Sequence, residues 1–253
     1  MIKLKYIPGF LLSLLMLSGT SEAMASEDDD NEPSGNEHPA FTPPGFNFDI
    51  GIYSQHIWRG TATSYSPSIE PSISYNHKNF TAGVWAAQSI NGDYTEMDVF
   101  LSYSLKNFTL TLYDYYCPPT LNTRHRLFNY EAKSTWHSID VNLEYGGTDK
   151  FPISFLLATM IYGDDRNPVT LENYYSTYFQ MGYDYEIRQH SFSLFMGVSP
   201  QENYYGHRFG IVNTGITANS KLQFNNMIAV PFEASIITNP MANNLYLVVG
   251  FSL

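Results

Sequence analysis

The chain has 253 residues and a formal net charge of −11, and this acidic balance without a basic stripe argues against nucleic acid as a partner. Its single cysteine, Cys117, excludes an internal disulfide and a cysteine metal cluster. We expect a lone half-buried thiol, with pairing between chains as the alternative. We also expect neither a metal site nor a cofactor. No stretch after residue 25 reaches about 18 consecutive apolar residues, so a membrane-spanning helix is not expected.

Residues 1–25 have the three parts of a secretory signal peptide. Lys3 and Lys5 form a positively charged start, residues 10–17 form a short apolar core, and a small-x-small cleavage site ends at Ala25. No cysteine follows the apolar core, as a lipoprotein signal would require. We therefore expect export, cleavage near Ala25 and no lipid anchor.

Residues 26–45 are acidic and rich in proline. No lysine or arginine offsets the acidic residues of this segment, which are Glu27, Asp28, Asp29, Asp30, Glu32 and Glu37. Such a segment cannot bury a core, so it is predicted to be disordered and to act as a solubilising spacer. A docking tail for a basic periplasmic partner is the alternative.

Residues 46–253 read as the strands of one all-β domain. The pattern predicts about twelve strands, at residues 46–57, 67–76, 79–89, 95–105, 108–116, 135–145, 151–161, 174–187, 190–199, 208–218, 221–232 and 243–253. The gaps between them are alternately short and long. The short gaps are His77-Lys78, Lys106-Asn107, Gly146 to Lys150, Arg188-Gln189 and Asn219-Ser220. The long gaps are residues 59–66, 90–94, 117–134, 162–173, 200–207 and 233–243.

This sorting of the gaps is typical of a transmembrane, antiparallel, up-and-down β-barrel with short periplasmic turns and longer extracellular loops. An even number of strands places both termini of the barrel segment on the periplasmic side. Pro71 and Pro231 lie inside predicted strands and are expected to mark bulges or distortions.

Most predicted strands have an apolar face and a polar face, but residues 151–161 are apolar on both faces and residues 208–218 are ambiguous. From residue 95 to 105 the odd-numbered positions are apolar, whereas the even-numbered positions include Glu96 and Asp98. In a soluble sandwich the apolar face would form the core, but in a barrel it contacts lipid and the polar face lines the lumen. Periodicity alone does not choose between them; the signal peptide, the sorted gaps and the apolar last strand favour the barrel.

Tyrosines gather where the predicted strands meet the long gaps. They are Tyr113, Tyr115, Tyr116, Tyr174, Tyr175, Tyr178, Tyr204 and Tyr205, with Trp58 and Trp136 at the same level. An aromatic girdle at the membrane interface explains most of them. A sugar-stacking platform at the barrel mouth is the alternative for those that face the lumen.

The short turn at His77-Lys78 predicts a strand register. If Asn76 pairs with Asn79, then Glu70 faces Trp85, and both strands turn their polar faces inward. Parity along the first strand carries Arg59 to the same side. The predicted lumen residues are Arg59, Glu70, Trp85, Glu96, Asp98, Asp140 and Glu144.

Two interpretations of these lumen residues stay open. One is an interior network of charges and hydrogen bonds that fixes the register, because buried carboxylates need partners. The other is a constriction that selects small cationic or neutral solutes, because rings of acidic side chains favour cations. A twelve-stranded lumen lies between filled barrels of about eight strands and wide porins of about sixteen, so only narrow solutes would pass.

Four short motifs carry a family resemblance. They are Ile57-Trp58-Arg59-Gly60-Thr61, Tyr75-Asn76-His77, Gly83-Val84-Trp85-Ala86, and Glu96-Met97-Asp98 followed by Tyr103. Together they resemble the signature of the Gcw_chp family, also called TorF-type porins, exported bacterial proteins first catalogued as conserved hypotheticals. The match covers residues 48–116, and the rest agrees only in general strand pattern.

The resemblance implies an outer-membrane barrel and supplies no substrate and no catalytic chemistry. This chain departs from the family in a short loop after Gly60 and in the position of Glu70. The residues that match the family motif are Arg59, Gly60, Gly83, Trp85, Glu96, Asp98 and Tyr103.

We therefore expect a narrow channel of the bacterial outer membrane, not an enzyme. A lipid hydrolase is a competing hypothesis, with Ser54 and His56 on the lipid face near the outer rim. No Gly-x-Ser-x-Gly element and no third aligned group accompany them.

A structural or adhesive barrel that works through its loops is the other competing hypothesis. The 117–134 gap carries Arg124, His125 and Arg126, for which a solvated loop is one interpretation and contact with anionic lipopolysaccharide is the other. Outer-membrane lipid, a small solute and, through the C-terminal strand, the barrel-assembly machinery are the remaining expected partners.

Overall fold

The structure is a computed structural model that describes residues 44–119, 126–224 and 228–253. Across these ranges, no helix is long and apolar enough to cross a membrane. The predicted signal peptide, its cleavage site near Ala25 and nearly all of the acidic segment 26–45 lie outside the described residues.

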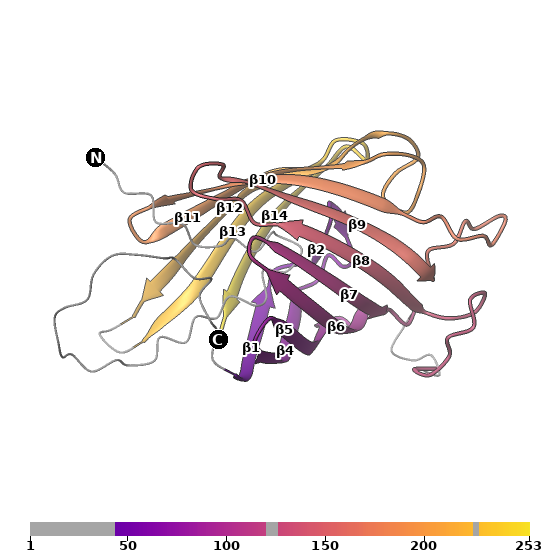
Figure 1. The fold of residues 1–253 in the computed structure, drawn as a ribbon, viewed down its shortest axis with the longest axis horizontal. Helices are drawn as coiled ribbons and strands as arrows, with labels where there is room; N and C mark the ends of the chain where they lie inside the picture. Colours follow the sequence, from indigo (N-terminus) through magenta and orange to yellow (C-terminus); the bar gives the residue numbers. More distant parts are fainter. Residues whose placement is uncertain (1–43, 120–125, 225–227) are drawn as a thin grey trace.

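Twelve strands of the described chain close into an antiparallel barrel (Figure 1). They are β1 (Gly45–Tyr53), β4 (Ser68–His77), β5 (Phe80–Ser89), β6 (Thr95–Leu105), β7 (Phe108–Tyr116), β8 (His137–Tyr145), β9 (Ile153–Gly163), β10 (Thr177–Ile187), β11 (His190–Ser199), β12 (Gly210–Gln223), β13 (Ala229–Asn239) and β14 (Asn244–Ser252). Neighbours in this order pair with each other, and β14 returns to β1. The predicted all-β, up-and-down barrel is confirmed.

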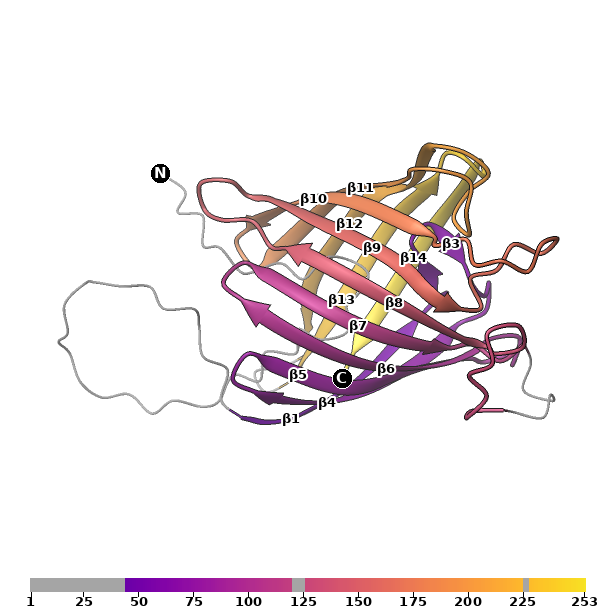
Figure 2. The same ribbon diagram turned by 45° about the vertical axis from the view of Figure 1, so that its right-hand side comes forward.

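The two ends of the barrel differ in the length of their connections, as predicted (Figure 2). At one end Leu105 pairs with Phe108 and Ile187 pairs with His190, each across a tight turn. At the other end, longer connections follow β1, β7, β9 and β11. Gly45 begins β1 and Ser252 ends β14 at the short-turn end, so the first and last strands of the barrel have their outer termini at this end.

The last strands differ from the prediction. Asn219 and Ser220 do not form a turn but pair with Glu233 and Phe232 inside a long β12–β13 ladder. The predicted long gap at residues 233–243 is therefore mostly strand, followed by a short turn. A barrel lumen accepts polar side chains, so a polar dipeptide within a strand does not require a turn.

The β4–β5 turn lies one residue later than predicted. His77 pairs with Phe80, and Ser72, not Glu70, faces Trp85. Because the register sum changes by two, no side chain changes face, and Glu70 is still buried in the lumen.

The two prolines cause no register shift. The β1–β4 and β12–β13 ladders pass Pro71 and Pro231 in unbroken register, although the β4–β5 pairing is interrupted beside Pro71. Register shifts occur instead between Ile139 and Asp140 in β8 and in the β11–β12 ladder after Gly197. The expected bulges are therefore absent at both prolines, whereas the interrupted β4–β5 pairing is the distortion expected at Pro71.

Large apolar side chains cover the outer surface of the barrel. On β6, Val99, Leu101 and Leu105 are exposed, whereas Asp98 and Phe100 on the opposite face are buried. Exposed apolar side chains alternate with buried ones in the same way on β14. The predicted division into an apolar outer face and a polar inner face is confirmed.

Aromatic pairs follow the outer surface beside the short turns. These pairs are Phe46–Tyr75, Phe80–Tyr103, Phe108–Tyr145, Phe155–Phe179 and Phe232–Phe251, with ring centroids 4.8–5.8 Å apart. The predicted girdle at the long-loop end is wrong for most of its tyrosines, because Tyr113, Tyr115, Tyr116, Tyr178 and Tyr205 are buried. Most of these rings fill the lumen and do not contact lipid.

Candidate functional site

A short hairpin, β2 (Ile57–Trp58) and β3 (Thr61–Ala62), lies inside the barrel (Figure 1). Its strands pair with each other in a sheet of their own, separate from the wall. The first barrel strand ends at Tyr53, so the predicted strand 46–57 is too long and the chain turns inward after it. We call residues 57–62 the plug hairpin.

Arg59 and Gly60 form the tip of the plug hairpin. Both have positive φ, 47° and 82°, as in the type I′ turns that fit two-residue hairpins. A Cβ on Gly60 would lie 2.0 Å from the backbone oxygen of Val212 in β12, so the backbones approach too closely for a side chain. Asn239 donates from Nδ2 to the Gly60 oxygen at 3.1 Å. The tip is therefore seated against β12 and β13.

Arg59 binds the opposite wall. Its Nη2 lies 2.9 Å from Asp140 Oδ2 and donates to Asn142 Oδ1 at 2.7 Å, while Nη1 donates to the Tyr205 hydroxyl. The side chains of Arg59 and Asp140 are 1% and 0% exposed. The Trp58 ring lies 4.8 Å from the guanidinium carbon. The charge is thus satisfied by several partners at once, which a buried ion pair requires.

The apolar residues of the plug hairpin pack against strands from around the barrel. Trp58 contacts two buried clusters, one of Leu156, Ala158, Met160, Tyr178, Tyr205 and Val212, and one of Phe100, Tyr113 and Tyr115. Ile57 and Ala62 pack against a third cluster of Tyr53, Phe195, Ile237, Tyr246 and Val248. The hairpin therefore fills the lumen at the level of its tip.

His56 anchors the base of the plug hairpin to β4. Its Nδ1 lies 3.0 Å from Glu70 Oε1, and its ring is 5.3 Å from the Trp85 ring. Burial lowers the pKa of His56, but the charge and hydrogen bond of Glu70, together with the charge of Glu96, outweigh this effect, so the pKa is raised overall. The positive form of His56 is favoured by this contact.

Glu96 and Asp98 lie next to this anchor on β6. Glu96 accepts hydrogen bonds from the Tyr94 hydroxyl and, at 3.0 Å, from Cys117 Sγ. Asp98 is opposite Trp85 in the ladder, and its Oδ1 has no hydrogen-bond partner within the described residues. Cys117 is a free, half-buried thiol, as predicted.

All seven predicted lumen residues face the interior, but they form separate groups. Arg59 does not join Glu70, Glu96 and Asp98, because the inward turn of the chain carries it to Asp140. Glu144 is buried on the same face of β8.

Two further residues of the family motif have clear structural roles. A Cβ on Gly83 would lie 2.6 Å from Phe100 Cζ, so this position accepts little beyond glycine. Tyr103 is on the outer surface and contacts Phe80.

The residues of the hydrolase hypothesis do not share a face. Ser54 is exposed, and its Oγ accepts the backbone N–H of Val249 at 3.0 Å, whereas His56 is inside the lumen. Ser68 also hydrogen-bonds to Glu70, so the carboxylate lies between hydroxyl and imidazole. A nucleophile–base–orienter set needs the imidazole in the middle. In the described ranges, no group of three or more His, Cys, Asp or Glu residues could hold a metal ion.

Several contacts of the site were not predicted from the sequence. Asn142 and Gln180 lie on inward faces that parity identified, but nothing local distinguishes them from other lumen residues. Tyr205 and Asn239 fall in predicted gaps, where no face can be assigned. The available signal was Arg59-Gly60 between Ile57-Trp58 and Thr61, three strand-forming residues, which is compatible with a tight hairpin.

No family model matches the sequence, and no curated protein matches it. Among solved structures, a mutant of the porin of Rh. blastica aligns with 11% identity and a TM-score of 0.38, over 74% of this chain and 55% of that chain. The chain thus spans about half the length of that porin. An alignment this loose carries no argument about function, and the resemblance to the Gcw_chp family stays a prediction.

Proposed function

We propose that this chain is an outer-membrane barrel of the porin type, exported by a signal peptide cleaved near Ala25. The apolar outer surface supports insertion into a bilayer, since soluble proteins rarely expose patches of this extent. The aromatic pairs beside the short turns would lie at the periplasmic interface. The barrel-assembly machinery would recognise the exposed apolar residues of β14.

We further propose that the lumen admits small cationic or neutral solutes. The observation that carries this proposal is the acidic inner face, formed by Glu70, Glu96, Asp98, Asp140 and Glu144. Among the described residues, Arg59 is the only buried arginine or lysine. An acidic lining attracts cations and repels anions. No catalytic role is part of the proposal.

In the channel that we propose, this structure would be the closed state, because the plug hairpin occupies the lumen. Its two strands share no backbone ladder with the wall, so the hairpin can move without breaking the barrel. Side-chain contacts of His56, Arg59 and Asn239 hold it in place. Passage of a solute would require at least the tip to withdraw.

Planar-bilayer recording of the refolded protein tests the channel. We expect steps that prefer cations, and a weaker preference after Glu96→Gln with Asp98→Asn. The matched control is Asp149→Asn with Glu172→Gln, which removes the same charge from exposed positions. Unchanged cation preference in the lumen variant would reject the acidic filter. If neither the native chain nor a variant with an unseated plug gives steps, the channel itself is rejected.

A structural or adhesive barrel is the second candidate, favoured by the dense packing of the plug hairpin in the lumen. It would act through the 117–134 connection, of which Arg124 and His125 lie outside the described residues. The Arg126 backbone N–H donates to the Tyr116 hydroxyl at 3.1 Å. Binding to lipopolysaccharide without conductance in any variant would support this candidate.

A further inference from the structure

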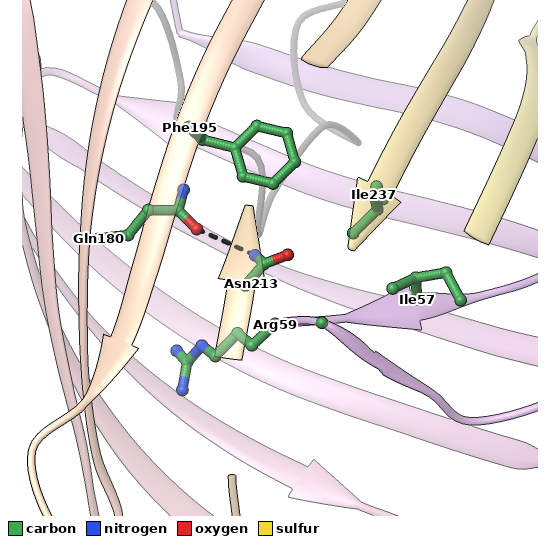
Figure 3. A pocket seen from close by; sticks show the side chains of 7 residues that line it. Ile57, Arg59, Gln180, Phe195, Asn213 and Ile237 are labelled. Carbon is green, nitrogen blue, oxygen red and sulfur yellow. Dashed lines mark hydrogen bonds between the residues drawn. The ribbon is translucent and has the colours of Figure 1, made fainter. Parts of the chain in front are cut away.

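A small pocket lies between the plug hairpin and strands β10–β13 (Figure 3). Its volume is about 20 Å³, which has room for about one water molecule. Apolar side chains of Ile57, Phe195 and Ile237 form part of its lining, and the polar side chains are those of Arg59, Gln180 and Asn213.

Three buried polar atoms at this pocket have no hydrogen-bond partner within the described residues. They are Arg59 Nε, Gln180 Nε2 and Asn213 Oδ1, on residues that are 4%, 2% and 6% exposed. Buried polar atoms are almost always paired, because an unpaired one keeps its desolvation penalty. All three residues line the same small pocket, which therefore offers a ligand up to three unpaired polar groups.

The other polar atoms of the two amides are already engaged. Asn213 Nδ2 donates to the Tyr178 hydroxyl at 2.9 Å and to Gln180 Oε1 at 3.2 Å, and the Tyr178 hydroxyl donates to Gln180 Oε1. Exchanging O and N in both amides would reverse this network. Gln180 would then present an acceptor and Asn213 a donor. In either orientation, two donors and one acceptor remain, since Arg59 Nε always donates.

We propose that this pocket binds one water molecule, which bridges the plug hairpin to the barrel wall. Its oxygen accepts from the two donors and gives one hydrogen to the acceptor. The apolar lining and the small volume exclude larger solutes, and no carboxylate lines the pocket to hold a cation. This inference does not depend on conductance, because the water would seat the hairpin in a channel and in a structural barrel alike.

A crystal structure of the full chain, at a resolution that orders internal waters, tests the site directly. We expect one density peak within hydrogen-bond distance of Arg59 Nε and of both amide side chains. An empty pocket, or amides rotated so that none of the three atoms is unpaired, would overturn the proposal. This measurement needs no variant to fold.

Gln180→Met keeps the length of the side chain and removes its amide, so the peak should be lost. Ser154→Ala is the matched control, because Ser154 Oγ is also buried without a partner but does not line the pocket. A peak that persists in Gln180→Met, or that disappears in Ser154→Ala, contradicts the assigned ligands. In solution, nuclear Overhauser contacts from a long-lived water to the Gln180 and Asn213 amides should be present in the native chain, and their absence overturns the site.

Discussion

Arg59 and Asp140 form a buried ion pair, 2.9 Å between Nη2 and Oδ2, that joins the tip of the plug hairpin to strand β8 of the wall. Asp140 Oδ2 also accepts from the Tyr115 hydroxyl at 3.3 Å and from Asn142 Nδ2 at 3.5 Å, but within the described part of the chain Arg59 is the ion-pair partner of this carboxylate. The pair couples the element that fills the lumen to the barrel that surrounds it.

Arg59→Met should lower the free energy of unfolding by about 3–5 kcal/mol, because it leaves the Asp140 charge buried and unpaired. Adding Asp140→Asn should restore part of this loss, since no isolated charge then remains. Urea unfolding followed by tryptophan fluorescence in detergent measures both changes. Losses that simply add in the double variant would show that the two residues are not coupled.

Gly60→Ala should unseat the plug hairpin while the barrel stays folded. The new Cβ would meet the Val212 oxygen at 2.0 Å, and the φ of 82° disfavours any side chain. We expect larger or more frequent conductance steps in planar bilayers, with unchanged heat-modifiable migration on gels. Gly45→Ala is the control, because no atom lies within 4 Å of its Cβ position. Equal conductance in the two variants would argue against a movable plug.

The His56–Glu70 contact should make the seating of the plug hairpin depend on pH. Because the folded pKa of His56 is raised above the ordinary value of 6.5, its contribution is fully present below about pH 6.5 and is lost as the pH rises through the folded value. The urea concentration at the unfolding midpoint should therefore decrease as the pH is raised from acidic to mildly alkaline values. His56→Gln should remove this dependence, whereas His77→Asn, at an exposed position, should keep it. A midpoint independent of pH in the native chain would contradict the role of His56.

The β1–β14 seam should be the weakest line of the barrel wall. It contains three paired residues, from Gly51 to Tyr53, with backbone hydrogen bonds between Ile50 and Leu253 at one end and from Ser54 N–H to the Val249 oxygen at the other. The Ser54 hydroxyl adds a bond by accepting the Val249 N–H. Ser54→Ala should cost about 0.5–1.5 kcal/mol and speed amide exchange in β14.

Ser104→Ala is the comparison for this seam variant. It removes a hydroxyl bond to Thr109 at 3.0 Å from a ladder of nine pairs between β6 and β7. Exchange in β14 should not change in this variant. If Ser104→Ala accelerates β14 exchange as much as Ser54→Ala does, the seam is not a separate weak point.

The site was harder to predict than the wall. The interior position of Asp140 and Glu144 follows from alternation within one strand, and Asp140 was correctly expected in the lumen. Its pairing with Arg59 could not be predicted, because the two residues are far apart in sequence and no local feature of either residue identifies its partner. The prediction of a turn at Asn219-Ser220 was wrong for a related reason, because polar residues occur both in turns and at lumen-facing positions of strands.

The sequence by itself determined the number of barrel strands, the two faces of most of these strands and the difference between the short-turn end and the long-loop end. These properties depend on side-chain alternation and on gap length, which are local, and a register error of two residues at His77 left the face of Glu70 unchanged. Only the tertiary structure decided that the chain turns inward after Tyr53 and that Arg59 meets Asp140. An inward hairpin is stable only where a closed barrel supplies buried partners on the opposite wall, and those partners come together only on folding.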